Sequence, residues 1–186
     1  MTTRDRIVQL GRDFIQQFGY HSFKYQLVSK ELNIKNAAVH HYFPAKEDLG
    51  VAVIEKDKTD FLQMTESLKD KPARDKVEGL IGLYNLYNDS GKNLCVIGAC
   101  ISAFTELPQR MGAAALKYQD AIITWLVEVF GEGLKNGEFQ FPEPPEALAS
   151  LWMAALPGAL QSAKARGSDY FRAVVDQLRR SLNQRD

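Results

Sequence analysis

The apolar residues near the amino terminus predict two short helices joined by a tight turn. The first helix ends near Leu32 and the second begins near Asn36, so that five apolar side chains turn inward: Val28, Leu32, Ile34, Val39 and Phe43. Asn33 falls at the turn, where the backbone often enters the left-handed region, which Asn tolerates better than most residues. The second helix exposes small and hydrogen-bonding side chains suited to a DNA major groove: Asn36, Ala37, Ala38, His40 and His41.

The same periodicity predicts helices along the rest of the chain. A first helix has its apolar stripe at Ile7, Leu10, Phe14 and Phe18 and stops at Gly19. Later helices are expected over residues 45–68, 76–88, 94–107, 110–135 and 147–165, followed by a last helix after Gly167-Ser168. Pro157 is expected to kink the helix that contains it. With no alternating pattern typical of strands, the fold class is all-α.

The amino-terminal segment resembles the DNA-binding domain of the TetR/AcrR family of one-component repressors. The matching positions are Gly19-Tyr20, Val28-Ser29, Ile34, Val39, Tyr42-Phe43 and the run from Lys46 to Leu49. Departures are Phe23-Lys24 in place of a Thr pair, Asn33 and Ala37 in place of Gly, Lys35 in place of Ser, and His40 in place of Tyr. The resemblance implies a three-helix helix-turn-helix domain, placed at residues 1–48, joined to a helical ligand-binding and dimerisation domain over residues 49–186.

The charge distribution agrees with a nucleic-acid partner at this end of the chain. The whole chain is neutral, but residues 1–50 hold seven Lys and Arg against five Asp and Glu, a net charge of +2, so the remainder carries −2. All three histidines also lie in this segment. The residues expected to contact double-stranded operator DNA are Lys24, Lys35, Asn36, Ala37, His40, His41, Tyr42 and Lys46.

The body carries aromatic and flexible side chains that are candidates for an effector cavity, which the family resemblance implies. They are Phe61, Met64, Tyr84, Tyr87, Phe104, Tyr118, Trp125 and Trp152. Such residues at helical spacing also form ordinary cores. If they line a cavity, the effector is an apolar or amphipathic small molecule, because such pockets bind mainly by burial.

Cys95 suggests a second kind of sensor. If Asn93 caps the following helix, Cys95 lies in its first turn beside Lys92, where the helix dipole favours a reactive thiolate. This local pattern is similar to the N-ethylmaleimide-responsive subgroup of the family. The alternative is that Cys95 and Cys100 are small buried hydrophobes in a reducing compartment.

The last two helices are expected to form a homodimer, because the family resembled uses a four-helix interface there. The residues placed at that interface are Trp152, Ala155, Ala159, Phe171, Val174, Val175 and Leu178. The alternative is that these stripes face the core of a single chain. A dimer would also space two reading helices about one DNA turn apart.

Enzymatic motifs are absent from the sequence. It contains no G-x-x-x-x-G-K-[ST], G-x-S-x-G or H-E-x-x-H pattern. The adjacent His40 and His41 point about 100° apart on a helix, and two cysteines without C-x-x-C spacing do not form a zinc site. We therefore expect no cofactor, no metal, no membrane segment and a cytoplasmic location. The expected function is a ligand-responsive repressor. The alternatives are a redox sensor acting through Cys95 and a small-molecule binding module without operator function.

Overall fold

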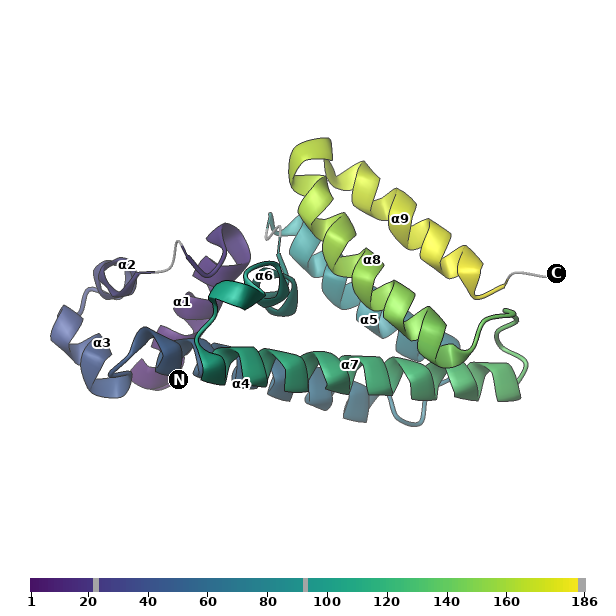
Figure 1. Cartoon of the computed structure of the whole chain (residues 1–186), viewed down its shortest axis with the longest axis horizontal. Helices are drawn as coiled ribbons and strands as arrows, with labels where there is room; N and C mark the ends of the chain where they lie inside the picture. The colour runs from purple at the N-terminus through teal and green to yellow at the C-terminus, as the bar shows by residue number, and fades with distance from the viewer. Residues whose placement is uncertain (22–23, 92–93, 184–186) are drawn as a thin grey trace. The chain divides into compact units, whose positions relative to one another are not determined.

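The computed structural model describes residues 1–21, 24–91 and 94–183, and every regular element in these ranges is helical (Figure 1). The elements are α1 (Thr3–Phe18), α2 (Tyr25–Glu31), α3 (Asn36–Tyr42), α4 (Lys46–Ser67), α5 (Ala73–Asp89), α6 (Val96–Ser102), the 3₁₀ turn η1 (Phe104–Glu106), α7 (Gln109–Lys135), α8 (Pro145–Arg166) and α9 (Ser168–Ser181). The only β-type pairing in these ranges is an isolated bridge between Gln140 and Asn183. The predicted all-α fold class is confirmed.

Glycines end several helices where the sequence predicts. Gly19, which follows α1, and Gly167, between α8 and α9, have φ angles of 77° and 88°. Both values lie in a region where a side chain would be strained, so glycine stops the helix at low cost. Gly137, just after α7, has a φ of 72°. Pro145 occupies the first turn of α8, where its missing N–H costs no hydrogen bond.

Other expectations for single elements are corrected by the structure. The helix expected over residues 94–107 is instead the short α6, followed by η1. Helix α5 begins at Ala73, three residues before the predicted start. In α1 the buried side is formed by Ile7, Val8, Gly11, Ile15 and Gln16, whereas Phe18 is 51% exposed. The helical prediction for α1 is therefore confirmed, but the predicted buried side of the helix was wrong.

One compact unit comprises residues 1–60 and 96–118. In it, α1 packs against α2 and α6, and α2 packs against α3. Its core includes Ile7, Ile15, Leu49, Val53 and Met111, each fully buried. Two glycines allow close helix packing here: a methyl group on Gly11 would lie 3.2 Å from Val53, and one on Gly50 would overlap Met111.

The other compact unit comprises residues 61–95 and 119–186, described as far as residue 183. Helices α8 and α9 run side by side, and both pack against α5 (Figure 1). Phe130 lies at the centre of an aromatic cluster, with its ring centroid 5.4 Å from that of Trp152 and with further contacts to Phe139 and Phe141. Helix α8 continues through Pro157.

The functional boundary predicted after residue 48 does not coincide with these compact units, and it stays a prediction. Among the described residues, no helix is long and apolar enough to cross a membrane.

Candidate DNA-binding site

Helices α2 and α3 form the predicted helix-turn-helix. Asn33 has a φ of 51°, and it is the one non-glycine residue in the left-handed region among those described. This confirms the prediction for the turn. After it, the Ile34 amide donates to the Ser29 carbonyl at 3.0 Å. Val28 and Val39 are fully buried, and Phe43 is nearly so. The burial of Val39 orients α3 so that the side of the helix opposite this residue faces the solvent.

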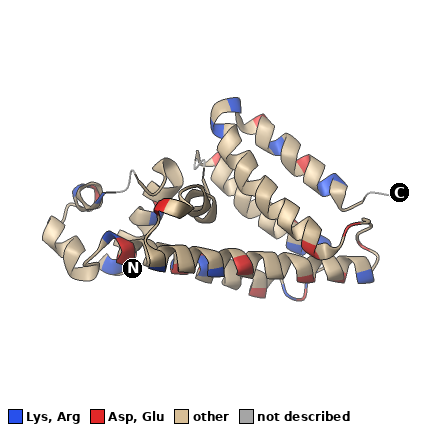
Figure 2. Ribbon diagram, viewed as in Figure 1, with Lys and Arg blue, Asp and Glu red and all other residues tan. Residues whose placement is uncertain are grey.

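The outward side of α3 brings together most of the predicted DNA-contacting residues. Ala37, His40, His41 and Tyr42 are exposed, and Lys35 precedes them as the N-cap residue. Helix α3 contains no Lys, Arg, Asp or Glu, whereas Lys and Arg occur on neighbouring elements (Figure 2). The exposed side of α3 is therefore free of the carboxylates that would repel phosphate groups.

Asn36 differs from the other residues of this group. It is only partly exposed, and its side-chain oxygen is buried without a hydrogen-bond partner. A contact between this oxygen and a base edge therefore requires the side chain to rotate outward.

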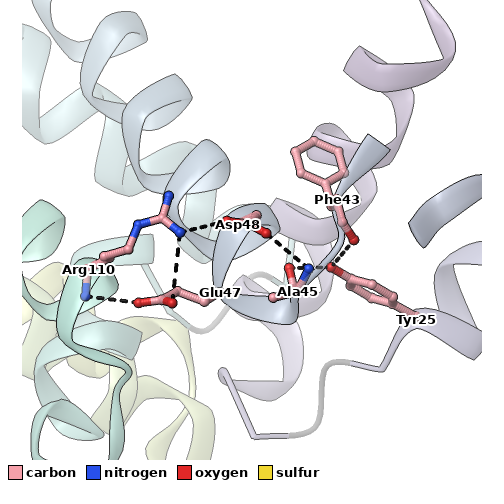
Figure 3. A network of polar contacts seen from close by, with 6 residues as sticks. All are labelled: Tyr25, Phe43, Ala45, Glu47, Asp48 and Arg110. Atoms are coloured by element: carbon pink, nitrogen blue, oxygen red, sulfur yellow. Dashed lines mark hydrogen bonds and ion pairs between the residues drawn. The ribbon is translucent and has the colours of Figure 1, made fainter. Parts of the chain in front are cut away.

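His40 and Tyr25 hold α3 against the rest of the motif. Their ring centroids are 4.8 Å apart, and His40 Nδ1 lies 3.4 Å from the carbonyl oxygen of Pro44. The Tyr25 hydroxyl donates to the carbonyl groups of Phe43 and Ala45, at 2.9 Å and 2.5 Å (Figure 3). Burial raises the pKa of Tyr25 to about 12, so the hydroxyl remains a donor at neutral pH. Tyr25 was not among the DNA-contacting residues predicted from the sequence. The available signal was an aromatic residue with a polar tip at a helix start.

Two of the predicted DNA-contacting residues, Lys24 and Lys46, lie on neither α3 nor its N-cap. Lys24 is exposed at the N-cap of α2, and neither α2 nor α3 has an acidic residue in its first turn. Lys46 begins α4, and its ammonium group donates to the Tyr20 carbonyl at 2.9 Å and lies 4.0 Å from the centroid of the Tyr20 ring. Burial, followed by the nearby charge of Lys24, lowers the pKa of Lys46. Phe23 lies outside the described residues.

Several of the predicted effector-binding residues form aromatic pairs. Phe61 and Trp125 meet edge to face at 5.6 Å, and Tyr84 and Tyr87 at 5.9 Å. Trp152 is fully buried in its aromatic cluster, and its indole N–H lies 3.3 Å from the Ser181 hydroxyl. Met64 is partly exposed.

The two other candidates, Phe104 and Tyr118, belong to the unit that contains the helix-turn-helix. Phe104 is 39% exposed. Tyr118 is buried and hydrogen-bonds to Asp57, which is ion-paired with Arg12 at 2.5 Å. Despite that pairing, burial raises the pKa of Asp57. Tyr118 is therefore part of a buried polar group as well as a candidate effector contact.

Cys95 does not lie in the first turn of a helix. It directly precedes α6, is 5% exposed, and accepts a hydrogen bond from the Tyr84 hydroxyl at 3.6 Å. Cys100 is fully buried, and no disulfide joins the two cysteines. Asn93 and Lys92, which supported the thiolate prediction, lie outside the described residues. The first-turn placement is thus corrected, because the helix begins at Val96, two residues later than predicted.

Most of the predicted dimer residues are buried within the single chain. Trp152, Ala159, Phe171, Val175 and Leu178 are each 5% exposed or less, whereas Ala155 and Val174 are partly exposed. The five buried residues face the core of their own unit, as the alternative interpretation held. The side of α8 that stays open carries Leu151, Ala154 and Gly158, which recur at helical spacing.

Comparison with known proteins agrees with this geometry. Residues 7–53 match the family model described as "Bacterial regulatory proteins, tetR family", a range that contains α2 and α3 and ends in α4. The chain is 25% identical over 171 residues to the transcriptional regulator AcuR of Cereibacter sphaeroides, covering 85% of this chain and 74% of that protein.

Solved structures extend the similarity to the whole fold. A TetR-family transcriptional regulator from Agrobacterium tumefaciens superposes with a TM-score of 0.90 at 26% identity, covering 97% of both chains. A TetR transcriptional regulator from Legionella pneumophila does so with a TM-score of 0.86 at 28% identity, covering 98% of both chains. The helical arrangement of the body is therefore shared, as well as the helix-turn-helix.

Proposed function

The chain belongs to the TetR family of transcriptional regulators, and from this premise we propose that it is a repressor released from its operator DNA by a small-molecule effector. The observation that carries this proposal is the α2–α3 motif, in which α3 exposes hydrogen-bonding side chains and contains no carboxylate. Because chromosomal DNA is the partner, the proposed location is the cytoplasm.

The proposed DNA contacts divide into two kinds. Ala37, and Asn36 after rotation of its side chain, are assigned to base edges and thymine methyl groups. Lys24, Lys35, Lys46, His40, His41 and Tyr42 are assigned to phosphates, which set the position of the protein on the duplex but read no sequence. His40 suits this second role, because its contacts with Tyr25 and Pro44 already fix its ring.

The proposed effector is an apolar or amphipathic small molecule that binds within the body. Support comes from the aromatic pairs Phe61–Trp125 and Tyr84–Tyr87, both formed within one compact unit. Trp125 is partly exposed and so remains accessible, whereas Trp152 is fully buried. Of the candidates in this unit, we favour Trp125 over Trp152 as an effector contact.

The proposed assembly is a homodimer that uses the open side of α8. Leu151 is 54% exposed, and a methyl group placed on Gly158 would meet no atom within 4 Å. Together with Ala154 these residues form a stripe that lets a second helix approach closely. Ala173 of α9 is also exposed.

Release from DNA is proposed to occur by a population shift. The effector binds more tightly to the conformation in which the two helix-turn-helix motifs of the dimer are separated. It lowers the affinity for DNA by the free energy of that difference in binding. By the same linkage, operator DNA must weaken effector binding by the same factor.

The experiment is selection of duplexes from a random-sequence library by the wild-type protein, followed by gel shifts with the selected duplex. Enrichment of a two-fold symmetric sequence, bound with strong salt dependence, is expected. The triple variant Lys24→Ala, Lys35→Ala, His41→Ala should lose binding while keeping its circular dichroism spectrum. Failure to enrich any sequence would contradict the repressor function and leave a small-molecule binding module.

A further inference from the structure

The first turns of α4 and α7 are joined by an arginine that the DNA-binding function does not yet explain. The Arg110 backbone amide donates to Glu47 Oε1 at 2.9 Å, and its guanidinium donates to Asp48 Oδ1 at 2.7 Å (Figure 3). All three residues belong to the compact unit that contains the helix-turn-helix. One residue of α7 thus holds two adjacent carboxylates at the start of α4.

From Asp48, further hydrogen bonds lead toward the end of α3. The second oxygen of Asp48 accepts the Ala45 amide at 3.0 Å, and the Ala45 carbonyl accepts the Tyr25 hydroxyl. Tyr25 also binds the carbonyl of Phe43, the residue at which α3 ends. Hydrogen bonds therefore run without a gap from α7, through the start of α4 and the connection after α3, to α2 (Figure 3).

Packing beneath this network makes the joint between α4 and α7 tight. Met111, the residue after Arg110, is fully buried, and its sulfur lies where a side chain on Gly50 would begin. Movement of the first turn of α7 cannot be absorbed by a loose contact here, because both the polar and the apolar contacts would have to break. The hydrogen bond from Arg110 also lowers the pKa of Asp48, which keeps its carboxylate ionised at neutral pH.

We propose that Arg110 is a positioning residue for DNA reading, which holds the Phe43–Ala45 connection and α3 in the binding conformation through Asp48. Through Arg110, the affinity for DNA depends on the position of the first turn of α7. Arg110 touches no base or phosphate in this proposal. The proposal rests on the DNA-binding function, since without it there is no affinity to set.

The test measures the affinity of Arg110→Ala, Asp48→Asn and the double variant for the duplex selected by the wild-type protein. Each single variant should bind roughly 3- to 30-fold more weakly, and the double variant no more weakly than Arg110→Ala alone, because the two act through one contact. Glu47→Gln should bind like the wild type, since an amide oxygen still accepts the Arg110 amide. The second control is Lys56→Ala, which removes a cation of α4 that is ion-paired within its own helix.

Two further readouts separate positioning from other roles. The salt slope of binding should stay unchanged in Arg110→Ala, whereas loss of a phosphate contact would lower it by about one. Hydrogen exchange of free Arg110→Ala should speed up in peptides covering residues 43–50, with little change elsewhere. A lowered slope, additive losses in the double variant, or wild-type affinity in Arg110→Ala would each overturn the proposal. Absence of DNA binding by the wild-type protein would instead overturn the proposed function.

Discussion

At the scale of single residues, the candidate site combines groups that are free to meet DNA with groups already engaged by the protein. Lys35, His41 and Tyr42 are exposed, whereas Lys46 is held by the carbonyl and ring of Tyr20. An engaged cation loses less side-chain entropy when it meets a phosphate, because its conformation is already restricted.

Lys46→Ala is predicted to weaken binding to all duplexes alike and to lower the salt slope by about one, since it removes one proposed phosphate contact. The measurement is affinity for selected and random duplexes at several salt concentrations. Lys56→Ala, at an exposed position of the same helix, should leave the slope unchanged. The thermal unfolding of Lys46→Ala must also be measured, because this substitution removes the hydrogen bond to the Tyr20 carbonyl. An unchanged slope in a folded variant would remove Lys46 from the contact residues.

Cys95 is predicted to react slowly with a maleimide in the folded protein, because it is 5% exposed and lies before α6 rather than in its first turn. Labelling followed by mass spectrometry, in Cys95→Ser and Cys100→Ser, separates the two thiols. Both should react at the ordinary rate in denaturant. Fast labelling of Cys95 in the folded chain, titrating below the ~8.5 of a free thiol, would restore the redox-sensor hypothesis.

At the scale of elements, several helix starts are completed by residues distant in the chain. Helix α5 has no side-chain cap from its own N-cap residue, Pro72. Instead Glu138, after the end of α7, accepts the amides of Ala73 and Arg74 at 3.1 Å and 3.0 Å. The hydrogen bond from the Arg74 amide is the largest influence on Glu138 and lowers its pKa, as does the bond from Ala73.

Glu138→Ala is predicted to lower the free energy of unfolding by about 1 kcal/mol at neutral pH, the usual cost of a lost cap. Because the folded-state pKa of Glu138 is lowered, its contribution is present above the unfolded pKa of about 4.3 and is lost as pH falls through the folded value. Denaturant unfolding of both proteins between about pH 7 and pH 4 tests this. A difference that grows toward acid pH would contradict the cap.

At the scale of the whole molecule, the proposed dimer depends on which side of α8 faces outward. The two sides are similar in composition, since both are rich in Ala and Leu. The contact of Trp152 with Phe130 fixes one of them inside the chain and leaves Leu151, Ala154 and Gly158 outside.

Leu151→Glu is predicted to dissociate the dimer, because an unpaired charge buried at an interface costs several kcal/mol. Sedimentation velocity measures the change, and DNA affinity should fall with it because each half-site then binds alone. The matched control is Leu86→Glu on α5, where the leucine is 67% exposed and outside the proposed interface. A dimeric Leu151→Glu protein would place the interface elsewhere.

The sequence by itself determined the features that depend on neighbours in the chain. Helical periods, the helix stops at Gly19 and Gly167, the left-handed Asn33 and the helix-turn-helix all follow from local backbone preferences and from side-chain spacing. The exposed residues of α3 were predicted on the same basis, because the burial of Val39 settles the direction of a short helix.

Only the tertiary structure decided which stripe of each long helix faces inward and which polar groups meet across the chain. The stripe expected on α1 was rotated, and five of the residues expected at the dimer interface are core residues. The bond between Arg110 and Asp48 joins residues 62 positions apart, and that between Glu138 and Ala73 joins residues 65 apart. Periodicity gives the spacing of an apolar stripe but not the element against which it packs. Hydrogen bonds between residues so far apart in the sequence form only once the helices have packed.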